Sequence, residues 1–207
     1  MTQTIISRQN QSMPVPMVNL VECEQVVAIL DSIASPAIVD RALRSADISR
    51  KVFKAAPGFL PYRIEAVVLE SVARSVGVHY LGAQVAMSFD YSAYGFYAGY
   101  VLGAQNLGSA LMRGRSALSL THPGSDIVLR KSGNHLVVGR TSNINTIVGH
   151  RHLDEGAIFM IGNVIRHFLG PNYRPAWIEI TGNDPRSVSF LEELICAPVR
   201  TGAPMPA

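Results

Sequence analysis

The chain has 207 residues, 48% of them hydrophobic and 16% charged, which suits one well-buried globular domain and is too short for two of full size. The formal net charge is only +3 and no run of lysine and arginine is longer than two, which argues against a clustered basic face for nucleic acid. Cys23 and Cys196 share no motif, which disfavours a cysteine-based metal or redox site and favours a reducing, cytoplasmic location. No apolar segment reaches the ~20 residues that span a membrane, so we expect a soluble protein without a membrane partner.

The first part of the chain is predicted to be mostly helical. Residues 1–19 are polar, contain prolines and are expected to form a flexible arm. Apolar spacing then predicts a helix over 21–33 and a second helix that starts at Pro36, and the two form a helical hairpin. After a connection, one helix is expected to end at Gly77, and another covers 80–89. A helical layer therefore precedes any sheet.

The later part of the chain mixes strands with helices. The segment "SDIVLRKSGNHLVVGRTS" predicts two short strands around the turn "KSGN". A helix is expected over 152–169, "RPAWIEIT" has the alternation of a strand, and a last helix begins with Asp184 at its cap and Pro185 in its first position. The sequence therefore predicts an α+β fold, with helices packed around a small, mainly antiparallel sheet.

One stretch contains regularly spaced glycines and regularly spaced tyrosines: "YGFYAGYVLGAQNLGSALMRGR", from Tyr94 to Arg115. In a helix, which turns by roughly 100° per residue, Gly95, Gly99 and Gly103 would share one face while the tyrosines fan across the other. A helical glycine costs roughly 1 kcal/mol relative to alanine, so three in a row predict a neighbouring element packed closely on the backbone. A large side chain at Gly99 is then expected to destabilise the fold.

The tyrosine face has two interpretations, a filled core or the wall of a ligand cavity, because a buried tyrosine hydroxyl needs a partner and suits a small molecule. The candidate ligand-binding residues form an aromatic group, with polar partners placed near it. They are Tyr91, Tyr94, Tyr97 and Trp177 for the walls, with Arg113, Arg115 and His167 for polarity. An arginine near an apolar pocket is a natural carboxylate clamp, whereas a solvated helix face is the alternative for each arginine and a core position the alternative for His167 and Trp177.

Catalytic chemistry has little support in the sequence. There is no nucleophile-elbow serine, no phosphate loop and no paired carboxylates in a glycine-rich setting. His150 and His152 would face one way on a strand and could ligate a metal, but no third ligand stands at a diagnostic spacing, and a polar loop entering a helix is favoured instead. We therefore expect no metal and no cofactor.

The chain resembles the N-terminal, arabinose-binding-like effector domain of AraC-type transcription regulators. The resemblance is carried by the glycine-tyrosine stretch and the helix after it, by the hairpin "GSDIVLRKSGNHLVV", by "RPAWIEIT" and by "SFLEELICAPV", over about Val21 to Val199. It departs from the family where Arg200, Thr201 and Gly202 follow the Pro-Val pair, a place where an aromatic residue is expected. The family's helix-turn-helix pair, which would follow roughly a hundred residues later, is also missing, so the chain is either part of a longer regulator or a stand-alone sensor.

The resemblance implies an effector-binding and dimerisation domain over 20–200, followed by a C-terminal tail over 201–207. Its expected partners are a small-molecule effector, a second copy of the chain, and DNA only through the missing domain. The N-terminal helices or the helix from Asp184 to Cys196 are candidate dimer surfaces. Two other functions stay open: a small enzyme that uses His150, His152 or His167 as acid or base, and a dimerisation module without a ligand.

Overall fold

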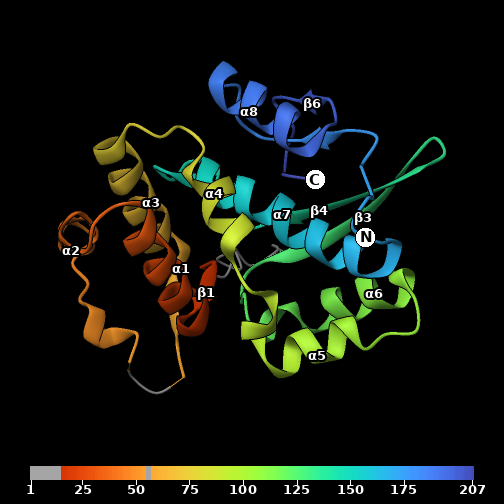
Figure 1. The fold of residues 1–207 in the computed structure, drawn as a ribbon. Helices are drawn as coiled ribbons and strands as arrows, with labels where there is room; N and C mark the ends of the chain where they lie inside the picture. Colours follow the sequence, from red (N-terminus) through yellow and green to blue (C-terminus); the bar gives the residue numbers. More distant parts are fainter. Residues whose placement is uncertain (1–14, 55–56) are drawn as a thin grey trace, which may run out of the picture.

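Helices dominate the structure, a computed structural model that describes residues 15–54 and 57–207 (Figure 1). The α-helices are α1 (Leu20–Ile33), α2 (Pro36–Ser45), α3 (Tyr62–Val76), α4 (Leu81–Ser88), α5 (Phe96–Leu102), α6 (Leu107–Ala117), α7 (His150–Leu169) and α8 (Pro185–Ile195). Short 3-10 turns occur at η1 (Arg50–Val52), η2 (Tyr91–Tyr94) and η3 (Leu118–Leu120). The helices expected from apolar spacing are confirmed, with ends that differ by a few residues.

The strands form three separate pairs rather than one sheet. β1 (Met17–Asn19) lies antiparallel to β2 (Phe59–Pro61), and β3 (Asp126–Ser132) lies antiparallel to β4 (His135–Thr141). β5 (Ile178–Glu179) lies parallel to β6 (Val199–Arg200). The predicted α+β class is confirmed, and the hairpin around "KSGN" is its longest strand pair.

Residues 17–19 and the C-terminal residues 206–207 make contacts that the sequence did not indicate. Met17–Asn19, the last part of the expected flexible arm, is strand β1, so the prediction of a loose segment is wrong for those residues. Residues 1–14 lie outside the described residues. At the other end, Ala207 exchanges backbone hydrogen bonds with Glu179, and the Arg140 amide donates to the Pro206 carbonyl. The tail over 201–207 is therefore packed on the domain.

Local sequence signals explain where the helices begin and end. The Asn19 side chain accepts the Glu22 amide at 2.7 Å, which caps α1. Asn106 caps α6 and Asp184 caps α8 in the same way, as predicted. Gly77, at φ +71°, ends α3 in the left-handed conformation that glycine adopts without strain.

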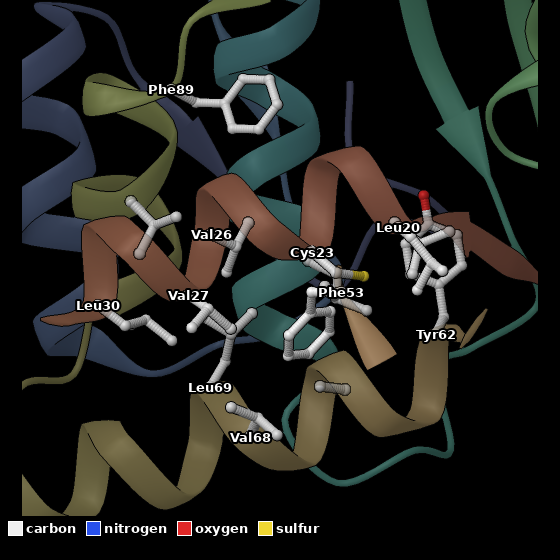
Figure 2. Packing of buried hydrophobic residues seen from close by; sticks show 14 of the residues in the cluster. Leu20, Cys23, Val26, Val27, Leu30, Phe53, Tyr62, Val68, Leu69 and Phe89 are labelled. Atoms are coloured by element: carbon white, nitrogen blue, oxygen red, sulfur yellow. The ribbon is translucent and has the colours of Figure 1, made fainter. Parts of the chain in front are cut away.

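The main hydrophobic core takes buried residues from every helix from α1 to α7, and α1 and α3 face each other across one part of it. Figure 2 shows Val26, Val27 and Leu30 of α1 directed at Val68 and Leu69 of α3. Ion pairs also stabilise the helical hairpin of α1 and α2. The Arg50 guanidinium contacts Asp31 of α1 at 2.7 Å and Asp40 of α2 at 2.5 Å. The N-terminal helical hairpin is thus a packed part of the domain.

The longest helix, α7, runs through the middle of the molecule and contacts α3, α4, α5, α6 and β4 (Figure 1). Its close fit to α4 depends on Gly82, where a Cβ would overlap the backbone of His152. Beyond this contact, a second, smaller core joins α4 and α7 to β5 and α8 through Ala83, Phe159, Ile178 and Leu191. α7 therefore connects the N-terminal helices with α5, α6 and strand β4.

Candidate functional site

The glycine-tyrosine stretch is not one helix. It begins as the 3-10 turn η2, reverses at Gly95 with φ +56°, and continues as α5 before a second break precedes α6. Only glycine adopts this backbone conformation readily. The turn at Gly95 places Tyr91, Tyr94 and Tyr97 together, with the Tyr94 ring edge-on to Tyr91 at 5.3 Å and to Tyr97 at 5.9 Å between centroids.

The predicted close packing of the glycines is wrong. A Cβ built on Gly95 or Gly99 would meet nothing within 4 Å, and one on Gly103 would meet only the Gly99 carbonyl of its own turn. Gly99 is exposed, so the steric reason for a strong Gly99→Leu effect is removed. The glycines that do allow close approach are Gly82 against His152 and Gly149 against Ala66.

A cavity of about 70 Å³ lies beside the three tyrosines, and we call it the tyrosine cavity. Its remaining wall is mainly apolar and comes from α6, α7 and the hairpin. The main wall residues are Leu111, Gly114, Ile127, Met160, Ile161 and Val164. Two polar side chains, His122 and Arg140, also line it. The cavity predicted at the tyrosine face is therefore present; whether it binds a ligand stays a prediction.

A second cavity of about 40 Å³ adjoins the first, and we call it the polar cavity. The two cavities share Tyr94, Arg140 and Met160 in their walls. The polar cavity is also lined by Glu22, Glu65, Tyr62 and His152. The two cavities are therefore neighbours, and the second combines apolar residues with several ionisable side chains in its wall.

Arg140 links the two cavities from strand β4. Its Nη1 donates to the Tyr62 hydroxyl at 3.0 Å, its Nη2 donates to the Leu153 carbonyl at 3.1 Å, and its guanidinium lies 5.2 Å from the centre of the Tyr62 ring. Its Nε is buried and has no hydrogen-bond partner among the described residues. Arg140 stands opposite Ile127 in the hairpin register, so both side chains reach the tyrosine cavity.

Glu22, from α1, is fully engaged. It accepts the Tyr94 hydroxyl at 2.6 Å and the His122 Nε2 at 2.7 Å, and His122 is braced by Thr121 at 2.8 Å. Burial on its own would raise the pKa of Glu22, but the charge and hydrogen bond of His122, with the Tyr94 hydroxyl, lower it below the ordinary value. This carboxylate is therefore ionised at neutral pH.

Glu65, from α3, behaves in the opposite way. Its side chain is buried, with 7% of the residue exposed, and its Oε2 has no hydrogen-bond partner within the described part of the chain. Burial, together with the nearby charge of Glu22, raises its pKa well above the ordinary value of 4.5. The raised pKa favours the protonated form of Glu65, which can donate as well as accept a hydrogen bond.

The other predicted ligand-binding residues do not line the tyrosine cavity. Arg113 donates to the Tyr100 carbonyl at 2.9 Å and lies over the Tyr100 ring, while Arg115 pairs with Asp126 at 3.3 Å. His167 is exposed on α7 and stands against Phe168. The alternative of a solvated helix face therefore fits the exposed Arg115 and the partly exposed Arg113, whereas His167 occupies neither the core position expected as its alternative nor the cavity.

Trp177 lies on a surface groove of about 280 Å³ between the hairpin and the C-terminal end of α7. Its Nε1 donates to Glu179 at 3.0 Å, and the Arg200 guanidinium stacks on the ring at 3.8 Å from its centre. The structure thus brings together three of the seven predicted ligand-binding residues, the tyrosines, and leaves the rest outside their cavity.

The histidine pair is not on a strand. Both residues are in the first turn of α7, where His150 Nδ1 contacts the Ile147 carbonyl at 2.9 Å. His152 is buried, accepts the Gly82 amide on Nδ1 at 3.3 Å and reaches Glu70 through Nε2 at 3.1 Å. Over the described residues, no group of three or more His, Cys, Asp or Glu side chains is placed to hold a metal ion.

Sequence reasoning missed the polar half of the site. The signal was present, because Glu65 interrupts a buried face of α3 that also contains Tyr62, Leu69 and Val72. A charged residue within an apolar stripe is rarely buried without a reason. Arg140 likewise follows Val138 on the inward side of β4.

A comparison with family models identifies the kind of domain. Residues 38–207 match the model described as "Arabinose-binding domain of AraC transcription regulator, N-term", which covers most of the chain. The chain belongs to this family. It is therefore a ligand-binding regulatory domain of the type that serves transcription regulation. A search of curated protein sequences gave no match. Within residues 15–54 and 57–207, no helix is both long and apolar enough to cross a membrane.

Proposed function

We propose that this domain binds a small organic effector in the tyrosine cavity and passes the signal to a helix-turn-helix domain that binds DNA. The observation that carries the proposal is a mainly apolar cavity lined by Tyr91, Tyr94 and Tyr97, next to a second cavity that has ionisable side chains in its wall. Binding sites for small molecules commonly combine apolar walls with a few convergent polar groups. In this proposal the chain is a sensor and not an enzyme. Because it controls a domain that binds DNA, we also propose a cytoplasmic location.

We propose that α7 transmits the signal, because it lines the cavity. α7 contributes Met160, Ile161 and Val164 to the cavity and also packs on α4 and α3. A ligand that fills the cavity therefore contacts a helix that spans the molecule, and stabilises whichever arrangement of that helix it fits best. We include a homodimer in the proposal, with the N-terminal helices or α8 as its surface.

The test is a thermal-shift screen of organic acids, amino acids and sugars. A ligand that binds only the folded domain raises its melting temperature with the logarithm of ligand concentration above the dissociation constant. If none of the three classes shifts the transition, the alternative of a dimerisation module without a ligand replaces the proposal.

A matched pair of alanine variants locates the binding site. A Cβ at Gly114 would enter the tyrosine cavity at ordinary contact distances, 3.5 Å from Ile127 Cδ1 and 3.6 Å from the Tyr97 hydroxyl. Gly114→Ala should therefore fold well and weaken effector binding. Gly108→Ala is the control, since Gly108 is on the same helix, is exposed and does not line the cavity. Equal effector affinity in both variants would place the ligand elsewhere.

A further inference from the structure

The polar cavity contains two groups whose hydrogen-bonding capacity is unused. Arg140 Nε and Glu65 Oε2 are buried, and neither has a partner within the described residues. Leaving a buried polar group unpaired costs about 1–3 kcal/mol, and more when the group is charged. Two such atoms in the wall of one cavity suggest a binding partner from outside the chain.

The charges of the site indicate the sign of that partner. Among the ion pairs of the described residues, none involves Arg140. Its polar contacts are the neutral Tyr62 hydroxyl and the Leu153 carbonyl. Two carboxylates, Glu22 and Asp154, act on Arg140 through their charge without a direct contact. Glu22 is already held by Tyr94 and His122, and Asp154 accepts a hydrogen bond from Thr181. A partly buried guanidinium without a carboxylate of its own favours an anion.

We propose that the effector is a small organic acid, whose apolar body occupies the tyrosine cavity and whose carboxylate enters the polar cavity to accept hydrogen bonds from Arg140 Nε and from the Glu65 carboxyl group. This inference rests on the proposed sensor function and adds the chemical class of its ligand. Glu65 suits the role because burial and the charge of Glu22 raise its pKa, which favours the protonated carboxyl group. A protonated Glu65 donates to a carboxylate, whereas an ionised one would repel it.

The volumes limit the size of the acid. One water-sized body needs about 10–15 Å³ of such space, so cavities of about 70 and 40 Å³ together hold a ligand of roughly ten heavy atoms or fewer. Short aliphatic acids and single-ring aromatic acids fit this description better than long-chain lipids or oligosaccharides.

The first experiment compares ligands that differ only in the head group. Calorimetric titrations of the whole chain at neutral pH use benzoate, benzamide and benzyl alcohol, and then hexanoate, hexanamide and hexanol. We expect at least one acid to bind tenfold or more tightly than its amide and its alcohol. An alcohol or amide that binds as tightly as its acid overturns the inference while leaving the sensor function intact.

The second experiment tests Arg140 itself. Arg140→Lys keeps the charge but removes the Nε donor and the planar fork, so it should weaken the acid tenfold or more and leave the alcohol unchanged. Arg130→Lys is the control, since Arg130 lies on the same hairpin but pairs with Glu179 at the surface. Equal loss of acid and alcohol affinity in Arg140→Lys would indicate a structural role only.

Should that variant fail to fold, the comparison of acids with their amides and alcohols decides alone. If no acid binds, the inference is wrong; if sugars and amino acids fail as well, so is the sensor function.

Discussion

At the scale of single residues, two glutamates in the wall of the polar cavity have pKa values shifted in opposite directions. Glu22 accepts two hydrogen bonds and has a lowered pKa, whereas Glu65 is surrounded without a partner for Oε2 and has a raised pKa. The same side chain thus supplies a fixed negative charge in one place and a proton donor in the other. Hydrogen bonds to the charged form make the difference.

The Tyr94 hydroxyl is predicted to stabilise the fold through Glu22. Tyr94→Phe removes a 2.6 Å bond to a buried carboxylate, and bonds to charged groups contribute about 1.5–3 kcal/mol, so the free energy of unfolding should fall by about 2 kcal/mol. Tyr97→Phe is the control, because its hydroxyl makes a 3.3 Å bond to the Gly114 carbonyl and should cost about 1 kcal/mol or less. Urea unfolding measures both, and equal losses would contradict the assignment of Glu22 as the stronger partner.

Glu65 is predicted to make stability fall as pH rises. Its pKa is raised in the folded state, so above the ordinary value of 4.5 the unfolded chain releases a proton that the folded chain retains. Glu65→Gln removes this linkage. Between that value and the raised folded-state pKa, the variant should gain stability relative to the native protein on the order of 1 kcal/mol per pH unit, and below that value the difference should not depend on pH. Denaturant unfolding across this range measures the slope, and parallel curves for the two proteins would refute the buried acid.

At the scale of the elements, local signals in the sequence were reliable where the backbone is regular. The caps at Asn106 and Asp184, the stop at Gly77 and the apolar stripes of α1, α3 and α7 all predicted helices that the structure contains. The failure came at Gly95, which the period of four assigned to a helical face. A glycine row with helical spacing does not reveal that one member has φ +56° and reverses the chain.

The close contact between α4 and α7 is predicted to tolerate a larger side chain less well than the glycine-tyrosine stretch does. Gly82→Ala forces a Cβ into the His152 backbone, and because overpacking costs ~1–3 kcal/mol even where side chains can move, a loss at the upper end or beyond is expected. Gly99→Ala meets nothing within 4 Å and should leave the melting temperature unchanged or raise it slightly. Thermal unfolding followed by circular dichroism compares the two, and a Gly82→Ala domain that melts like the native one would contradict this packing.

At the scale of the whole molecule, the site is assembled from residues far apart in the chain. Glu22, Glu65, Tyr94, His122 and Arg140 come from α1, α3, η2, the segment after η3, and β4. The sequence predicted the three tyrosines because they lie in one local stretch. It could not place Arg140 beside them, since that contact depends on how the hairpin packs on α3 and α7, and it selected Arg113 and Arg115 because of their nearness in sequence alone.

The charge distribution predicts that this chain by itself does not recognise a DNA sequence. The formal net charge is +3, and many arginines already have carboxylate partners: Arg50 with Asp31 and Asp40, Arg115 with Asp126, and Arg130 with Glu179. Specific readout needs an element laid in a groove with flanking phosphate contacts, and in AraC-type regulators that task belongs to the helix-turn-helix domain. Any binding should be weak, confined to low salt and insensitive to sequence, because scattered phosphate contacts are displaced by ions. A fluorescence titration at physiological salt, with a promoter fragment and a scrambled duplex as its control, measures this, and a clear preference for the promoter would reassign DNA recognition to this domain.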